Sequence, residues 1–486
     1  MNMKRYFISG SLFLVLSLML LAGCKGFSNA SLYANTPLSA SNMNLIFVVS
    51  PDLAHHAEGD IHPNTANLTP QGLQRSLSMA TYLKRHVLRT NNVTGIYVLA
   101  PMTHLQTANH YPDMVAIGYI QPFALQNQIT VRGTTANSYP INAAYAPGSL
   151  PAGVVEPKPY IPGAQGLTFN DVNGNNLALA TRIITANVPG FHVFSAPWET
   201  ISALMTDINT FHGYNLNLPA TYSGPNIVYA ISIPPSGKAR LVTLDSKLNP
   251  PATYPVLPKP VAAASCTKQS YFSITRTTGV NGVVVPAGVN TSQTVYLIRH
   301  VDAHPTSHFE DGNYVGAGQW RALALPDVLP KALRGQPSPT KVYSIDPAQS
   351  FALAADFRVS YVRPSLTVLP YAIANNLPYK LIASFYIGAA TDPAVARATY
   401  DFLFTGGHLS NQTVLLAWER EHLPPLVTYL ISSYGGTVPV LPLSWPQNDY
   451  DTIWTVTLDG QGNLTVNNAL CEGIDSALLP DTAPQF

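Results

Sequence analysis

Three places in the sequence bring Arg, His and Glu side chains to the ends of apolar runs. They are Arg299 and His300 after the run 294–298, Arg363 just before a helical pattern, and Glu419, Arg420, Glu421 and His422 after the run 413–418. Apolar runs of this length have the pattern of buried strands. In open α/β sheets, ligands bind at the carboxyl ends of the strands. We therefore expect these three groups of side chains to meet at one edge of a sheet.

These residue types suit chemistry on a phosphate group. A histidine such as His300 can attack phosphorus as a nucleophile. The neighbouring Arg299 can hold phosphate oxygens with two parallel hydrogen bonds and stabilise charge in the transition state. Arg363 and Arg420 can bind oxygens in the same way. Arginine stays charged, however, so Arg420 is not suited to proton transfer.

The leaving oxygen also needs a proton, and the sequence offers several acids for this step. The candidates are Asp302, Glu310, Asp311, Glu419 and Glu421. We favour Glu419, because it directly follows a predicted strand. The alternative is that Glu419 caps the next helix, since carboxylates are favoured in the first turn of a helix.

The elements that must position these residues occur twice along the chain. Similar runs and helix starts recur in the same order at 44–48 and 294–298, 68–88 and 316–323, 93–98 and 340–345, 192–199 and 413–419, and 226–232 and 452–457. Alternating strands and helices predict an α/β fold, a layered and mostly parallel sheet flanked by helices. The shared order favours two related copies over a chance similarity between two α/β units.

The predicted copies occupy residues 44–246 and 293–486, and a proline-rich linker at 247–292 joins them. The first copy carries extra residues at 127–175, a stretch rich in Pro, Gly, Asn and Tyr. We expect this stretch to form a long irregular loop.

The second copy resembles the histidine phosphatase superfamily, also called phosphoglycerate mutase-like. The resemblance is carried by Val295-Tyr-Leu-Ile-Arg-His300, by Gly318-Gln-Trp-Arg-Ala, by Arg363 with Thr367, and by Val414 to Pro425. It covers 293–460 well and 44–245 loosely. It implies that the histidine becomes phosphorylated, that the arginines hold the phosphate, and that a histidine after the Trp-Glu pair completes the pocket.

Both copies depart from the family pattern. In the first copy Val49 and Ser50 stand in place of the Arg-His pair, Thr103 in place of the second arginine, and Thr200 after Trp198-Glu199 in place of the last histidine. The first copy is therefore interpreted as a degenerate partner without phosphate chemistry. In the second copy Arg420 follows Glu419, and His422 is displaced by two residues. Either Arg420 or His422 would then close the site.

The first residues of the chain predict export. Lys4 and Arg5 precede the apolar stretch 7–21, and small residues lead into Cys24. This is the pattern of a signal peptide at 1–23, and it resembles the bacterial lipobox, in which the cysteine is lipidated before cleavage. The alternative, a transmembrane anchor, would need about 20 apolar residues. We expect a flexible tether at 24–43 and a lipid anchor in the bacterial cell envelope. Because Lys25 rather than an aspartate follows Cys24, the outer membrane is favoured.

Composition excludes some partners. Charged residues make up only 10% of the chain, and the formal net charge is +1. No basic stripe suggests nucleic acid as a partner. Cys266 and Cys471 remain once Cys24 is lipidated, and outside the cytoplasm such a pair usually forms a disulfide; two separate buried thiols are the alternative.

No metal site and no cofactor are expected. The segment His55-His56-Ala-Glu58-Gly-Asp60-Ile-His62 contains metal-ligating side chains, but no periodicity brings them onto one face of a helix or strand. A solvated loop is the favoured interpretation of this segment.

Two hypotheses about function follow. The first is a lipid-anchored phosphomonoesterase that acts on a phosphorylated small molecule through His300. The second is an inactive surface lipoprotein that binds an anionic ligand or a protein partner in the same pocket. The intact Arg299, His300 and Arg363 favour the first hypothesis. The missing histidine after Glu419 and the degenerate first copy favour the second.

Overall fold

The computed structural model describes most of the chain after the predicted signal peptide. The described residues are 38–107, 111–128, 139–145, 153–155, 176–266, 271–303, 311–347, 350–354, 357–382, 393–437 and 443–486. The predicted signal peptide, Cys24, most of the predicted tether and Glu310 lie outside them. Among the described residues, no helix is both long and apolar enough to cross a membrane.

The first half of the chain builds a six-stranded sheet in the order β5-β2-β7-β1-β8-β9. Its strands are β1 (Met43–Val49), β2 (Gly95–Leu99), β5 (Ile141–Tyr145), β7 (Gly190–Ala196), β8 (Ile227–Ile233) and β9 (Arg240–Asp245). Strands β5, β2, β7 and β1 are parallel, and β8 and β9 add antiparallel pairs at one edge. Strand β5 lies inside 127–175, so this part of the predicted loop is an edge strand instead.

The second half builds a seven-stranded sheet in the order β10-β18-β17-β11-β16-β12-β15. Its strands are β10 (Ser273–Arg276), β11 (Gln293–Arg299), β12 (Lys341–Ile345), β15 (Tyr379–Ile382), β16 (Thr413–Trp418), β17 (Thr452–Leu458) and β18 (Leu464–Cys471). Strands β11, β16, β12 and β15 are parallel. Strand β10 lies within the predicted linker 247–292, where it pairs with β18 as an edge strand.

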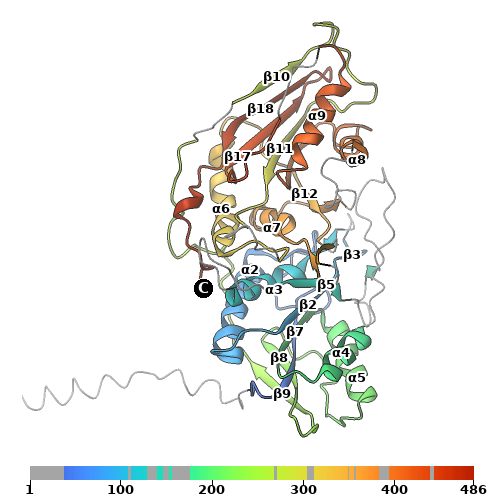
Figure 1. The fold of residues 1–486 in the computed structure, drawn as a ribbon, viewed down its shortest axis with the longest axis vertical. Helices are drawn as coiled ribbons and strands as arrows, with labels where there is room; N and C mark the ends of the chain where they lie inside the picture. The colour runs from blue at the N-terminus through green and yellow to red at the C-terminus, as the bar shows by residue number, and fades with distance from the viewer. Residues whose placement is uncertain are drawn as a thin grey trace, which may run out of the picture. The chain divides into compact units, whose positions relative to one another are not determined.

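Helices follow the parallel strands in both halves (Figure 1). In the first half they are α2 (Pro70–Tyr82), which continues into the π-helix Leu83–Leu88, α3 (Val115–Asn127), α4 (Asn176–Ala186) and α5 (Trp198–Phe211). In the second half they are α6 (Gly316–Ala332), α7 (Arg363–Asn375), α8 (Pro393–Phe404), α9 (Leu423–Ser433) and the short 3₁₀ helix Ser476–Leu478. Short strands form two small sheets beside them: β3 (Met102–His104), β4 (Pro112–Asp113) and β6 (Val154–Val155), and β13 (Ser350–Ala354) with β14 (Phe357–Ser360).

The two sheets have the same strand order, which confirms the predicted α/β fold in two related copies. Read from β5 and from β15, the orders correspond strand by strand, and β10 is the one addition among the described strands. In both halves the first strand pairs in parallel with the strand before the last long helix and antiparallel with the strand after it.

Alternate residues of β11 face opposite sides of the second sheet, as the two-residue period of a strand requires. Val295 and Leu297 belong to the apolar core formed with α9, whereas Tyr296 and Ile298 are equally buried but lie outside that cluster. Both faces of β11 are therefore covered. This explains why its sequence is a continuous apolar run rather than an alternating one.

One close contact is shared by the two halves and fixes the helix that follows the first strand. A Cβ on Gly72 of α2 would lie 2.1 Å from the carbonyl oxygen of Asp60, and a Cβ on Gly318 of α6 would lie 2.4 Å from that of Asp302. Only glycine allows this approach. Three residues later Arg75 binds Asp60 at 2.6 Å, and Arg321 binds Asp302 at 2.7 Å.

The structure corrects two of the sequence alignments. Val49 pairs with Ala196, and Arg299 pairs with Trp418. Trp198 therefore lies two residues beyond the position of Trp418. The second correction comes from the helices, because Arg363 is the first residue of α7 and Val115 is the first residue of the corresponding helix α3, whereas Thr103 lies in the strand β3. The Trp-Glu pairs have similar sequences but different positions, because the hydrogen bonds between strands, and not the similarity of residues, set the register.

Candidate functional site

Arg299 and His300 lie at the carboxyl end of β11, directly beside the end of β16. Arg299 pairs with Trp418, and the N–H of His300 donates to the carbonyl of Trp418 at 2.9 Å. Because β11 and β16 are parallel, the residues after them emerge at the same edge of the sheet. This places Glu419 next to the Arg-His pair.

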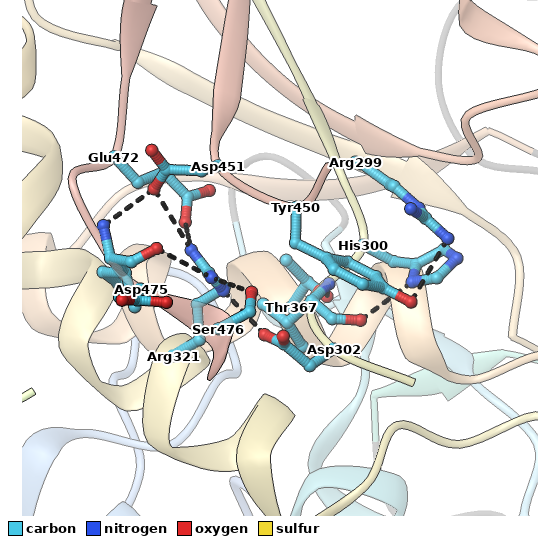
Figure 2. A network of polar contacts seen from close by, with 12 residues as sticks. Arg299, His300, Asp302, Arg321, Thr367, Tyr450, Asp451, Glu472, Asp475 and Ser476 are labelled. Carbon is cyan, nitrogen blue, oxygen red and sulfur yellow. Dashed lines mark hydrogen bonds and ion pairs between the residues drawn. The ribbon is translucent and has the colours of Figure 1, made fainter. Parts of the chain in front are cut away.

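His300 is buried, and its tautomer is set by the backbone. Its Nδ1 lies 2.9 Å from the carbonyl oxygen of Val301, which can only accept a hydrogen bond. Nδ1 therefore carries the proton, and the lone pair of the neutral ring is on Nε2. The N–H of Val301 donates to Thr367 Oγ1 at 3.1 Å, which ties the loop after β11 to helix α7 (Figure 2). The ring of Tyr361 lies edge-on to His300, with centroids 6.4 Å apart.

Arg299 is held between a ring and the backbone. Its Cζ lies 3.9 Å from the centroid of the Tyr450 ring, and the two side chains lie next to each other in Figure 2. Its Nη1 donates to the carbonyl of Gln447 at 2.5 Å, and its Nη2 donates to the Tyr450 hydroxyl at 3.3 Å. Its Nε is buried without a hydrogen-bond partner among the described residues. Burial lowers the pKa of Arg299.

Arg363 begins helix α7 and is completely buried. Its Cζ lies 4.8 Å from the ring centroid of Tyr361. Burial lowers the pKa of Arg363 to about 10. The negative charge of Glu419 opposes this shift, whereas the positive charge of Arg299 adds to it. Arg299 and Arg363 are therefore close enough to repel each other.

Glu419 and His422 form a pair next to Arg363. Glu419 Oε2 lies 2.7 Å from His422 Nδ1, and the hydroxyl of Tyr361 donates to Glu419. Burial alone would raise the pKa of Glu419, but His422, Tyr361 and Arg363 together hold it below its ordinary value. The ring of His422 stacks on Trp418 with centroids 4.5 Å apart. Glu419 thus links His422 to Tyr361 and Arg363.

Arg420 lies at the rim of this group. Its side chain is partly exposed, and its Nη2 donates to Glu421 at 2.6 Å. The positive charge of Arg420 nevertheless lowers the pKa of Arg299, although the burial of Arg299 lowers it more. Arg420 is thus a third cation near the site, on the solvent side.

The remaining acid candidates have other partners. Asp302 binds Arg321, Asp311 accepts from Gln128 at 2.8 Å, and Glu421 pairs with Arg420. Of the described candidates, Glu419 is the one in contact with the groups around His300. Sequence reasoning missed Tyr361 and Tyr450. The proximity of Tyr361 to Arg363 in the chain was a signal for the first, but no signal marked the second.

A buried ion cluster lies beside the site (Figure 2). Arg321 binds Asp302 at 2.7 Å, Glu472 at 2.8 Å and Asp451 at 3.4 Å, and it also donates to Ser476 at 2.6 Å. Burial raises the pKa of Glu472 to about 8 although Arg321 opposes the shift. The cluster joins the loop after β11 to the end of the β17–β18 pair where β17 begins and β18 ends.

The same sheet edge in the first half has different chemistry. The N–H of Ser50 donates to the carbonyl of Ala196 at 2.9 Å, so Ser50 occupies the place of His300. Val115 occupies the place of Arg363. Two residues after Ser50 lies Asp52, and two further carboxylates, Asp113 and Glu199, are close enough to act on it. Burial, and then the negative charges of Glu199 and Asp113, raise the pKa of Asp52 to about 6.

Cys266 and Cys471 form a disulfide, with Cα atoms 5.6 Å apart and a sequence separation of 205 residues. The bond ties the segment before β10 to the end of β18. Cys471 pairs with Thr452 at the start of β17 and directly precedes Glu472 of the ion cluster.

Known proteins resemble this chain only over part of its length and at low sequence identity. No protein-family model matches the chain, and no curated protein matches it. A solved structure of a proposed phosphohistidine phosphatase, SixA from Agrobacterium tumefaciens, is 17% identical over 34% of this chain and 92% of its own, with a TM-score of 0.21. A second structure, Mycobacterial hydrolase 2, is 13% identical over 40% of this chain and 92% of its own, with a TM-score of 0.24. Because both TM-scores are low, the functional proposal rests on the contacts of this chain.

Proposed function

We propose that the second half of the chain is a histidine-type phosphomonoesterase, with His300 as its nucleophile. The observation that carries this proposal is the burial of Arg299 and Arg363 around His300. Two buried guanidiniums that repel each other are costly to keep, and a bound dianion would neutralise both. A phosphate ester supplies that dianion and places its phosphorus beside the imidazole.

The reaction would run in two steps. His300 Nε2 attacks phosphorus, the bond from phosphorus to the ester oxygen breaks, and the leaving oxygen takes up a proton. Water then attacks the phosphohistidine, the phosphorus–nitrogen bond breaks, and inorganic phosphate leaves. The hydrogen bond from Nδ1 to Val301 holds the ring in the tautomer that the first step needs. Arg299 and Arg363 would stabilise the charge on the equatorial oxygens.

Glu419 does not fit the role of proton donor that we expected for it. A carboxyl whose pKa is held below its ordinary value is a carboxylate at neutral pH and has no proton to give. Its contacts suit orienting His422 and balancing the charge of Arg363. His422, held by Glu419 through Nδ1, is the better candidate for proton transfer to the leaving group.

The same observation favours a second candidate function, anion binding without turnover. Apart from the pair of Glu419 with His422, no described acid near His300 is placed to protonate a leaving group. A protein with this site could hold a phosphorylated or other anionic ligand and release it unchanged. Binding and turnover must therefore be measured separately.

The test is hydrolysis of an aryl phosphate by the purified protein from about pH 4 to pH 8, with inorganic phosphate binding followed by calorimetry. His300→Asn should abolish turnover and retain phosphate binding, whereas Ser50→Ala, at the equivalent position of the first half, should change neither. A base-stable, acid-labile phosphoryl group on the wild-type protein would identify the phosphohistidine. Phosphate binding that requires Arg363, without turnover, would favour the second candidate. Absence of both would refute both.

We also propose that the protein works outside the cytoplasm as a lipoprotein anchored to a bacterial membrane through Cys24. The support is the sequence Leu21-Ala22-Gly23-Cys24 after an apolar stretch. Cys24→Ser should abolish labelling by a radioactive fatty acid and release the protein from the membrane fraction. Unchanged labelling in this variant would refute the proposal.

A further inference from the structure

Three metal-ligating side chains of the first half meet at the sheet edge that corresponds to the His300 site. They are Asp52 and His55, from the loop after β1, and Glu199, from the first turn of α5. One donor atom from each lies within 4.8 Å of the other two. His55 Nδ1 and Glu199 Oε1 are 3.0 Å apart. The sequence predicts a solvated loop here, because no periodicity brings the ligating side chains of residues 55–62 onto one face, and Glu199 is not part of that segment.

Asp52 provides an independent sign of a missing partner. Its side chain is 1% exposed. Its Oδ1 accepts hydrogen bonds from the N–H groups of Ala54 and His55, at 2.7 Å and 2.6 Å. Its Oδ2 is buried with no hydrogen-bond partner among the described residues. A buried carboxylate oxygen without a donor is costly, and coordination to a cation would remove that cost.

The charge at this edge is opposite to that in the second half. Around His300 lie Arg299 and Arg363, with Arg420 at the rim. Around Asp52 lie Glu199 and Asp113, both close enough for their negative charges to act on it. The neighbouring His104 is paired with Asp113 at 2.9 Å, and the charge of Asp52 also acts on it. Equivalent edges of two related sheets therefore attract ions of opposite sign, and the first-half edge attracts a cation.

We propose that Asp52, His55 and Glu199 bind a divalent transition metal ion such as Zn²⁺. One imidazole and two carboxylates form a borderline ligand set that suits Zn²⁺ better than Ca²⁺ or Mg²⁺, which prefer oxygen alone. Ligand atoms about 2.0–2.2 Å from a tetrahedral metal lie roughly 3.3–3.6 Å from each other, slightly more than the 3.0 Å that separates His55 Nδ1 from Glu199 Oε1. Three protein ligands leave a coordination position for water or a small ligand. The ion would clamp the loop after β1 to α5.

The experiment measures binding of Zn²⁺ to the untagged, metal-stripped protein by calorimetry, and of Co²⁺ by its visible absorption. Removal of even an outer-shell partner weakens metal binding by roughly 10–100-fold, so Asp52→Asn, His55→Gln and Glu199→Gln should each weaken it at least about tenfold. Asparagine at position 52 keeps an oxygen that can accept from Ala54 and His55, so the loop should still fold.

His56→Gln and Glu58→Gln are the matched controls, because both lie in the same loop outside the cluster, and both should bind Zn²⁺ like the wild type. His300→Asn should also bind normally, which separates this site from the proposed phosphatase site. Two results would overturn the proposal: no binding of Zn²⁺ or Co²⁺ by the folded wild type at millimolar metal, or binding that survives all three ligand substitutions.

Discussion

At the scale of single residues, the two halves differ at positions that the fold makes equivalent. His300 and Ser50 make the same hydrogen bond to the neighbouring strand, yet only His300 carries the ring nitrogen that the proposed reaction needs. Arg363 and Val115 each begin the corresponding helix, and only Arg363 can bind an anion. The backbone frame is thus shared, and the charges placed on it decide which ion each half can attract.

Arg363 gives the first prediction at this scale. Its burial lowers its pKa to about 10, so its charge costs stability in the ligand-free protein. We expect Arg363→Met to lower the unfolding free energy by less than the roughly 3–5 kcal/mol that loss of a buried charge's partner usually costs, because Glu419 keeps His422 and Tyr361 as partners. The same variant should lose phosphate binding by roughly a hundredfold or more. Urea denaturation and calorimetry test the two effects. Loss of binding together with a collapse of stability would show that Arg363 has a structural role instead.

His192 gives the second prediction at this scale. Burial in β7 lowers its pKa to about 4, whereas an unfolded histidine titrates near about 6.5. Between these values the unfolded chain binds a proton that the folded chain does not. Stability therefore falls as the pH is lowered through this window, by about 2–3 kcal/mol from this residue. His192→Phe, which can keep the stacking on Tyr97, should flatten this part of the stability curve. A curve parallel to the wild type would contradict the assignment.

At the scale of elements, the anchoring of the helix after the first strand is the feature common to both halves. A glycine lets the helix approach the loop, and an arginine one turn later binds the aspartate of that loop. In the second half, Arg321 also binds two further carboxylates, those of Asp451 and Glu472. This connection also places Asp302 two residues after His300, so the same cluster steadies the loop that carries the nucleophile.

The cluster predicts a difference between two matched substitutions. Arg321→Met leaves Asp302, Asp451 and Glu472 without their common cation and should cost about 3–5 kcal/mol of unfolding free energy. Arg75→Met leaves one carboxylate, Asp60, and should cost less. Chemical denaturation of both variants in parallel tests this. Equal losses would show that the additional carboxylates contribute nothing to the fold.

Sequence patterns predicted the elements better than the contacts between them. Hydrophobic runs marked β1 and β11, because strands covered on both faces need apolar residues throughout. The Arg-His pair was found because it follows such a run. The cluster of Asp52, His55 and Glu199 was not found, because loop conformation and the docking of α5 bring these residues together. Trp198 was misaligned for a related reason, since strand register is a property of pairing.

At the scale of the whole molecule, residues 38–486 form one compact unit that contains both sheets. Side chains connect the halves: Gln128 donates to Asp311 at 2.8 Å, and Ser360 accepts from the N–H of Ala143 at 2.9 Å. The first half therefore supports the second through direct contacts. The two proposed sites would then share one folding unit while binding ions of opposite sign.

The disulfide gives the prediction at this scale. Cys266 and Cys471 are 205 residues apart, and closing so long a loop in the unfolded chain is worth up to about 5 kcal/mol in the chain-entropy account. The double variant Cys266→Ser, Cys471→Ser should therefore melt at a lower temperature than the oxidised wild type and match the reduced wild type. The sites at His300 and Asp52 use no contact from either cysteine, so phosphate and Zn²⁺ binding at room temperature should be unchanged while the variant is folded. If the variant melted like the oxidised wild type, the bond would not restrain the unfolded chain. If binding fell as well, the segment before β10 would be coupled to the sites through the second sheet.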